Sequence, residues 1–359
     1  MGKKRISKKF KKKVNKSQKP NSSSPIIQGI TYSNIKFIKN NHKNIIIYLN
    51  LIQNKKYILA ASEYKITLHD SKTYNKLSEN KIINGPLTEI IELTNGMIVA
   101  ITNSDYYFLK IDNNNSIEKI NHISYINPQI TSGLFQVNDE TIAIGREKLV
   151  YFYDFIKYEN IITLTPINFI KSCVQLNDHD NMMLISYNCV SFYHLLTYDQ
   201  YKYFEFPNNE IKKYIFLDKE DKEILFYSEN FIGIYNINEE KLIKEIKTKI
   251  TISCLIKLKD KNYIVIGGTD GSVFVYNLDS LQNIINYKMG NCCIYGIFEL
   301  SNDRILFNCT NNKIVLANYI QGIIYYKKKS KKITKFKKGI LMDNNDLIIG
   351  CKGNFIILN

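Results

Sequence analysis

The sequence predicts an all-β fold, a closed β-propeller of four-stranded blades that follows a disordered basic tail. Three observations support this. Short β-rich segments recur at nearly constant spacing, no helical pattern longer than two turns interrupts them, and positive charge gathers in two short segments. With 359 residues and 45% hydrophobic content, the chain can bury a sizeable core.

The repeat is an apolar strand, a polar turn and a second strand. The apolar strands are Ile58–Ala61, Met97–Ala100, Ile142–Gly145, Met183–Ser186, Ile224–Tyr227, Ile264–Gly267, Ile305–Asn308 and Leu347–Gly350. The second strands end 41 or 42 residues apart, at Asp70, Asp112, Asp154, Leu195, Asn236, Asn277, Asn318 and Asn359. A period of about 40–45 residues is typical of one four-stranded blade. Eight units predict eight blades, and seven blades stay open as the alternative if the unit ending at Asp112 is an insertion.

Two parts of the chain are expected to differ in order. Residues 1–25 are rich in Lys, then in Ser, Asn and Pro, and carry too few apolar side chains to fold, so they are predicted to form a disordered basic tail. Residues 26–359 are predicted to form one propeller domain. Because the last unit supplies only three strands, we expect residues 30–38 to pair with Phe355–Leu358 and close the ring, which removes exposed sheet edges.

One segment carries a family resemblance. The run from Val265 to Asn277 reads Val-Ile-Gly-Gly-Thr-Asp-Gly-Ser-Val-Phe-Val-Tyr-Asn and resembles the end of a WD repeat, with Tyr276-Asn277 at the Trp-Asp position. Tyr153-Asp154, Tyr235-Asn236 and His69-Asp70 are weaker versions of the same dipeptide. By period the resemblance covers nearly all of residues 30–359, and it implies the four-stranded blade. The chain contains no Trp and so departs from the family at its defining residue.

The net charge of +16 is concentrated in two short segments of the chain. Residues 1–24 contain ten Lys or Arg and no acid, residues 327–338 contain eight Lys and no acid, and the remainder has 31 bases against 33 acids. These two segments supply the candidate residues for nuclear import or for contact with RNA or another polyanion. They are Lys3, Lys4, Arg5, Lys8, Lys9, Lys11, Lys12, Lys13, Lys327, Lys328, Lys329, Lys331 and Lys332.

The sequence predicts no catalytic residue, metal site or cofactor. The five histidines fall in different units, and none stands at a zinc-ligand spacing from a Cys or another His. The run Gly267–Ser272 lacks the Gly-Lys-Ser/Thr ending of a phosphate loop and is interpreted as a β-turn. Seven scattered cysteines are interpreted as buried thiols in a reducing compartment, and no run of 18 apolar residues predicts a transmembrane segment.

The leading functional hypothesis is a non-enzymatic scaffold that presents propeller loops to protein partners, within a nuclear or nucleolar ribonucleoprotein assembly. We expect an intracellular protein, nuclear or nucleolar in preference to cytoplasmic, and a monomer inside a larger complex. Two alternatives stay open. One is an enzyme with a site at the central channel. The other is a peripheral membrane adaptor that uses the basic tail.

Overall fold

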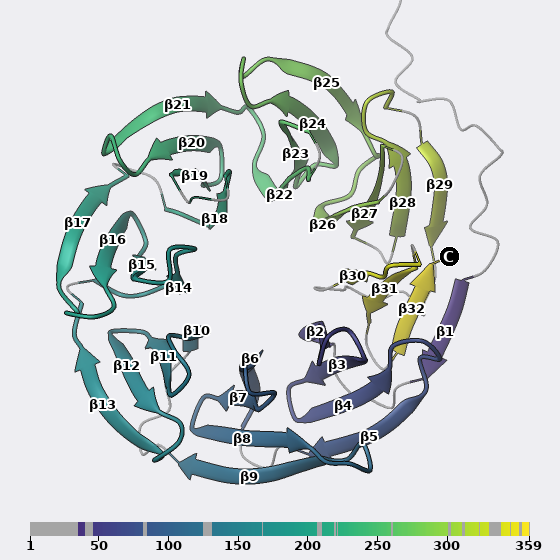
Figure 1. The fold of residues 1–359 in the computed structure, drawn as a ribbon. Coiled ribbons are helices and arrows are strands. Elements are labelled where there is room, and N and C mark those ends of the chain that lie inside the picture. Colours follow the sequence, from purple (N-terminus) through teal and green to yellow (C-terminus); the bar gives the residue numbers. More distant parts are fainter. Residues whose placement is uncertain are drawn as a thin grey trace, which may run out of the picture.

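A computed structural model shows eight four-stranded antiparallel sheets arranged as blades around a central axis (Figure 1). It describes residues 35–39, 46–81, 85–124, 131–166, 168–206, 210–218, 220, 222–259, 261–300, 303–310, 313–322, 324–329, 339–344, 346–351 and 354–358. The predicted all-β propeller is confirmed, and it has eight blades in preference to seven. The basic tail predicted for residues 1–25 lies outside the described residues.

Each blade is numbered by its order along the chain, and its strands run from the innermost to the outermost. Blade 1 contains β2 (Tyr48–Ile52), β3 (Tyr57–Ser62), β4 (Lys65–Asp70) and β5 (Lys76–Lys81). Blade 2 contains β6 (Leu87–Glu92), β7 (Ile98–Thr102), β8 (Asp105–Ile111) and β9 (Ile117–Ser124). Blade 3 contains β10 (Thr131–Gln136), β11 (Thr141–Arg146), β12 (Leu149–Asp154) and β13 (Glu159–Leu164). Blade 4 contains β14 (Ser172–Gln175), β15 (Asn181–Ile185), β16 (Cys189–His194) and β17 (Gln200–Glu205).

The second half of the chain repeats this order. Blade 5 contains β18 (Lys213–Phe216), β19 (Glu223–Tyr227), β20 (Phe231–Asn236) and β21 (Lys241–Lys247). Blade 6 contains β22 (Ile252–Lys257), β23 (Tyr263–Gly268), β24 (Ser272–Asn277) and β25 (Asn283–Lys288). Blade 7 contains β26 (Ile294–Glu299), β27 (Arg304–Cys309), β28 (Lys313–Asn318) and β29 (Ile324–Lys329). Blade 8 contains β30 (Gly339–Leu341), β31 (Leu347–Gly350), β32 (Asn354–Leu358) and, as its outermost strand, β1 (Ile35–Lys39).

Blade 8 therefore joins the two ends of the described chain. β1 pairs antiparallel with β32, from Ile35 opposite Leu358 to Lys39 opposite Asn354. Side chains of blades 1 and 8 meet at the same seam, where the Tyr74 hydroxyl donates to Asp346 Oδ2 at 2.6 Å. The ring is thus closed by backbone pairing and by direct blade contacts, and both ends of the described chain lie in one blade (Figure 1).

The core lies between the blades. The second strand of a blade is covered by neighbours on both faces, so it reads as a continuous apolar run. In β3, Ile58 and Ala60 pack in a cluster shared with blade 8, whereas Leu59 and Ala61 pack in a cluster shared with blade 2. The outermost strand β5 is half exposed to fully exposed, because it has solvent beyond it. Apolar side chains at alternate positions of the second strands therefore hold each blade to both neighbours.

The Asp and Asn residues at the ends of the third strands cap the turns that follow. Asp154 Oδ1 accepts bonds from the amides of Ile156 and Lys157 at 2.9 and 2.8 Å. Asp70, Asp112, Asn236, Asn277 and Asn318 accept equivalent bonds. A left-handed residue such as Tyr158 (φ 62°) then reverses the chain into the outermost strand. The Asp and Asn residues at the Asp position of the Trp-Asp dipeptide are therefore turn caps in this chain.

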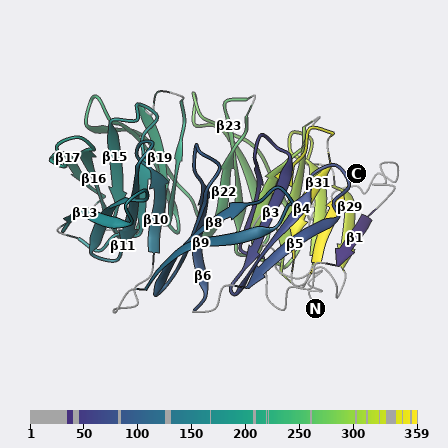
Figure 2. The same ribbon diagram turned by 60° about the horizontal axis from the view of Figure 1, so that its bottom comes forward.

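The alternation of strand direction gives the ring two different faces (Figure 2). The turns between the second and third strands, and the connections between blades, meet on one face, which we call the connection face. The remaining turns meet on the opposite face, which we call the hairpin face. On the connection face, the predicted β-turn in Gly267–Ser272 joins β23 to β24, with Gly271 at φ +84°.

Candidate interaction surfaces

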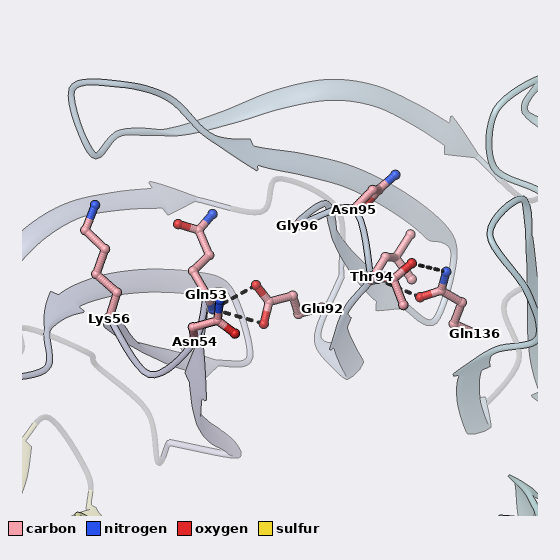
Figure 3. Close-up of a pocket in the computed structure, with 9 residues that line it drawn as sticks. Gln53, Asn54, Lys56, Glu92, Thr94, Asn95, Gly96 and Gln136 are labelled. Atoms are coloured by element: carbon pink, nitrogen blue, oxygen red, sulfur yellow. Dashed lines mark hydrogen bonds between the residues drawn. The ribbon is translucent and has the colours of Figure 1, made fainter.

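A polar groove of about 680 Å³ opens on the hairpin face across blades 1, 2 and 3. Gln53, Asn54 and Lys56 line it from blade 1, residues 92–96 line it from blade 2, and Gln136 lines it from blade 3 (Figure 3). The turn of blade 1 is unusual, because Gln53, Asn54 and Lys55 have φ of 48°, 52° and 66°. A left-handed run of non-glycine residues costs about 1–2 kcal/mol per residue and needs external support.

A contact between blades that recurs around the ring supports this turn. Four innermost strands end in Glu or Gln, and each of these side chains bonds to a turn of the preceding blade. The bonds run from Gln53 N to Glu92 Oε1 (2.9 Å), from Thr94 N to Gln136 Oε1 (2.8 Å), from Gln175 Nε2 to Val137 O (3.4 Å) and from Lys259 N to Glu299 Oε2 (3.0 Å). Figure 3 shows the first two inside the groove. The Glu92 and Gln136 side chains in the groove are therefore already used in hydrogen bonds that hold neighbouring blades together.

Replacing Glu92 by Ala is expected to destabilise the ring by about 2 kcal/mol, because both carboxylate oxygens accept from the amide of Gln53 and a charged hydrogen bond contributes about 1.5–3 kcal/mol. Replacing it by Gln should cost less than half as much, since Gln136 makes the same contact in the next blade. Urea unfolding of both variants measures the difference. If Glu92→Ala and Glu92→Gln lower the free energy of unfolding equally, the hydrogen bond to the Gln53 amide does not stabilise the ring.

An aromatic patch lies on the connection face of blade 4, and we call it the face patch. It consists of Phe169, Lys171 and Tyr187. The rings of Phe169 and Tyr187 lie 5.9 Å apart, and the Lys171 ammonium stands 4.7 Å from the centre of the Tyr187 ring. Tyr187 is 52% exposed and Phe169 is 36% exposed. Two large aromatic side chains thus face solvent beside a cation.

The connection between blades 4 and 5 holds the face patch in place. Lys171 Nζ pairs with Glu210 Oε1 at 2.6 Å and donates to the carbonyl of Ile211 at 3.0 Å. The amide of Ile211 in turn donates to the carbonyl of Tyr187 at 2.6 Å. The Lys171 ammonium donates a hydrogen bond to the Glu210 carboxylate, and this stabilises the charged form and lowers the pKa of Glu210 below its ordinary value. The patch is therefore a preorganised surface shared by two neighbouring blades.

The predicted basic residues fall mostly outside the described chain. Lys327, Lys328 and Lys329 form the end of β29, where Lys329 is paired with Lys313 of β28. These three lysines therefore belong to the outermost strand of blade 7. Lys331 and Lys332 lie outside the described residues, as do all the candidates of the N-terminal tail, namely Lys3, Lys4, Arg5, Lys8, Lys9, Lys11, Lys12 and Lys13.

Four of the five histidines are described, and one of them is buried. His69 is buried between Thr67 Oγ1 and the carbonyl of Tyr74, both at 3.2 Å, and burial lowers its pKa to about 4. His122 contacts Asp105 Oδ1 at 2.9 Å. Within the described residues, no three His, Cys, Asp or Glu side chains are grouped so as to hold a metal ion. His42 lies outside them.

The seven cysteines carry free thiols, and six of them are buried. Burial raises the pKa of the Cys254 thiol to about 12, so this thiol stays protonated at neutral pH. The part of the chain that the structure describes contains no helix long and apolar enough to span a membrane.

Comparison with solved structures identifies the architecture. Sqt1 of Saccharomyces cerevisiae superposes with a TM-score of 0.72 at 10% sequence identity, over 90% of this chain and 97% of that one. The C-terminal WD40 domain of Sif2 gives a TM-score of 0.70 at 10% identity, over 90% of this chain and 98% of that one. The fold is that of a WD-repeat-like propeller. The computationally designed Ika8 protein matches this propeller with a TM-score of 0.70 at 13% identity, over 89% and 98% of the two chains.

No protein-family model matches this chain, and no curated protein matches it. The period and the Asp/Asn turn caps therefore carry the resemblance to WD repeats. The sequence does not predict the face patch. The chain contains 26 Tyr and 18 Phe, so one aromatic residue in a turn does not stand out from the many others. A repeating Glu or Gln at the end of the first strand was a usable signal for the blade contacts.

Proposed function

We propose that this propeller is a non-enzymatic scaffold that binds protein partners through the connection face of blades 4 and 5. The observation that carries the proposal is the face patch. Aromatic side chains are enriched in protein interfaces, and tyrosine is one of the residues that most often dominates the binding energy. Because Ile211 in the connection between blades 4 and 5 fixes the turn that carries Tyr187, little conformational freedom is lost on binding.

The basic segments support a second part of the proposal, which is that the scaffold works within a nuclear or nucleolar ribonucleoprotein assembly. Ten basic residues in residues 1–24 and eight lysines in residues 327–338 would attract RNA or another polyanion by charge. The charge of these two segments is the support for this part of the proposal.

The experiment is affinity purification with mass spectrometry on four baits: the full chain, Tyr187→Ala, Tyr64→Ala and residues 25–359. Tyr64 is the matched control, because it lies in the equivalent turn of blade 1 and is 49% exposed. An interface tyrosine that contributes about 2 kcal/mol changes affinity about 30-fold. Tyr187→Ala should therefore lose partners that Tyr64→Ala keeps. Residues 25–359 should lose the partners that RNase releases from the full chain.

Two results would count against these proposals separately. Identical partner sets for Tyr187→Ala and Tyr64→Ala would remove the face patch as the protein-binding surface. Unchanged RNase-sensitive partners on residues 25–359, together with unchanged nuclear accumulation in cells, would leave the ribonucleoprotein part without support.

A further inference from the structure

Two thiols meet where the connection between blades 6 and 7 enters blade 7, and we call them the thiol pair. They are Cys292, in the connection, and Cys309, at the end of β27. Both side chains pack in one apolar cluster, and the two residues are 7% and 2% exposed. The two thiols share a hydrogen bond. Sulfur atoms from two different parts of the chain therefore lie side by side in the core.

Backbone hydrogen bonds beside the thiol pair fix its position. Ile294 is the register partner of Cys309. In the next pair of residues, the Thr310 amide donates to the Cys293 carbonyl at 2.8 Å, and the Cys293 amide donates to Thr310 Oγ1 at 3.1 Å. Residues two apart in an extended segment share a face, so Cys292 and Ile294 both lie on the side of Cys309, in the same apolar cluster. The thiol pair is therefore a fixed contact between the connection and β27.

The surroundings of the thiol pair favour nucleophilic chemistry at Cys292. The hydrogen bond to Cys292 and burial raise the pKa of the Cys309 thiol, so Cys309 keeps its proton and donates a hydrogen bond to the Cys292 sulfur. Such a bond stabilises a thiolate at Cys292. Lys313 is the register partner of Cys309, and its ammonium donates to a carbonyl of the connection at 2.9 Å, so a cation stands nearby. The exposed residues Gly290 and Asn291 precede Cys292, so a small reagent reaches it through a local opening of the connection.

We propose that the thiol pair is a redox-sensitive cross-link, which a small disulfide such as oxidised glutathione converts into a Cys292–Cys309 disulfide. The Cys292 thiolate attacks one glutathione sulfur and forms a mixed disulfide, and the glutathione thiolate that leaves takes up the proton lost by Cys292. The Cys309 sulfur then attacks the Cys292 sulfur, and its proton passes to the second glutathione that leaves. Two protein thiols are oxidised, and one glutathione disulfide is reduced to two thiols.

The disulfide would join the connection covalently to β27 and close the segment between them, which contains β26, into a loop. The connection also contacts blade 6, since the Met289 amide donates to the Gly271 carbonyl at 2.8 Å. A disulfide across a loop of this size restricts the unfolded chain and should raise the Tm by roughly 5 °C. This inference is independent of the proposed scaffold function, because it uses no residue of the face patch or of the basic segments.

The test uses the full chain, reduced with dithiothreitol, freed of reductant and incubated with oxidised glutathione before the remaining thiols are alkylated. Trypsin cleaves after Arg304, between the two cysteines, so the disulfide joins two peptides that mass spectrometry detects without reduction. The same treatment is applied to Cys292→Ser and Cys309→Ser. Cys293→Ser is the matched control, because Cys293 is the neighbour of Cys292 and is the more exposed of the two. Thermal unfolding of the reduced variants checks that each ring is intact.

We expect the joined peptides from the natural chain and, within twofold, from Cys293→Ser, and at least 10-fold less from Cys292→Ser or Cys309→Ser. The oxidised natural chain should unfold roughly 5 °C above the reduced chain, and dithiothreitol should reverse the shift. Glutathione attached to Cys293 without any joined peptides, loss of the joined peptides in Cys293→Ser, or equal Tm values for the oxidised and reduced chains would overturn the proposal.

Discussion

Deleting residues 1–39 is expected to lower the Tm of the ring by roughly 10 °C, whereas deleting residues 1–24 should leave it unchanged. The longer deletion removes β1 and leaves the five residues of β32 paired on one side only, with β31. A net contribution of about 1 kcal/mol per backbone bond gives about 5 kcal/mol, and each kcal/mol shifts the Tm by roughly 2 °C in a domain of this size.

Differential scanning calorimetry of both truncations and of the full chain measures the effect. The shorter deletion is the control, because it removes ten basic residues and keeps every strand that the structure describes. Equal Tm values for the two truncations would mean that the ring does not depend on the pairing of β1 with β32.

The second large effect is expected at Gly271, in the turn between β23 and β24. Its φ is +84°, and a Cβ placed there would lie 2.0 Å from the carbonyl oxygen of Gly290. Gly271→Ala therefore combines a strained backbone, about 1–2 kcal/mol, with a collision against rigid backbone, and we expect a loss of about 3–5 kcal/mol.

Gly96→Ala is the matched control. Gly96 has nearly the same φ, +80°, but a Cβ there would meet only Gln53 Nε2, at 3.9 Å. This variant should lose about 1 kcal/mol, so the difference between the two measures the close approach of the turn to the connection between blades 6 and 7. Chemical unfolding in urea gives both values. Similar losses for the two variants would show that backbone strain alone explains the effect.

The sequence predicts the second and third strands of each blade well for a physical reason. A second strand such as β3 is buried on both faces, so it must be apolar throughout, and a third strand such as β12 ends in an Asp or Asn that caps a turn. Outermost strands such as β5 (Lys76–Lys81) are largely exposed and rich in charge, so their composition does not separate them from loops. Their presence followed only from the length of the repeat.

The interaction surfaces could not be predicted in the same way. Gln53 and Glu92 belong to different blades, and their contact in the polar groove depends on how those blades stack. Phe169 and Tyr187 meet because a connection and a turn of blade 4 fold over the same end of its sheet. Local patterns encode strands and turns, whereas these surfaces arise from packing between units. Charge was visible in the sequence, but the segments that carry it lie mostly outside the described residues.

The most direct test of the scaffold assignment is lysine-specific cross-linking mass spectrometry of the full chain with a purified partner. We predict that cross-links to the partner concentrate on the connection face of blades 4 and 5, at lysines such as Lys212 in the connection between these blades and Lys247 at the end of β21. Lys72 and Lys81 of blade 1 are equally exposed and serve as the internal reference. Cross-links that concentrate on Lys72 and Lys81, with none on blades 4 and 5, would contradict the assignment.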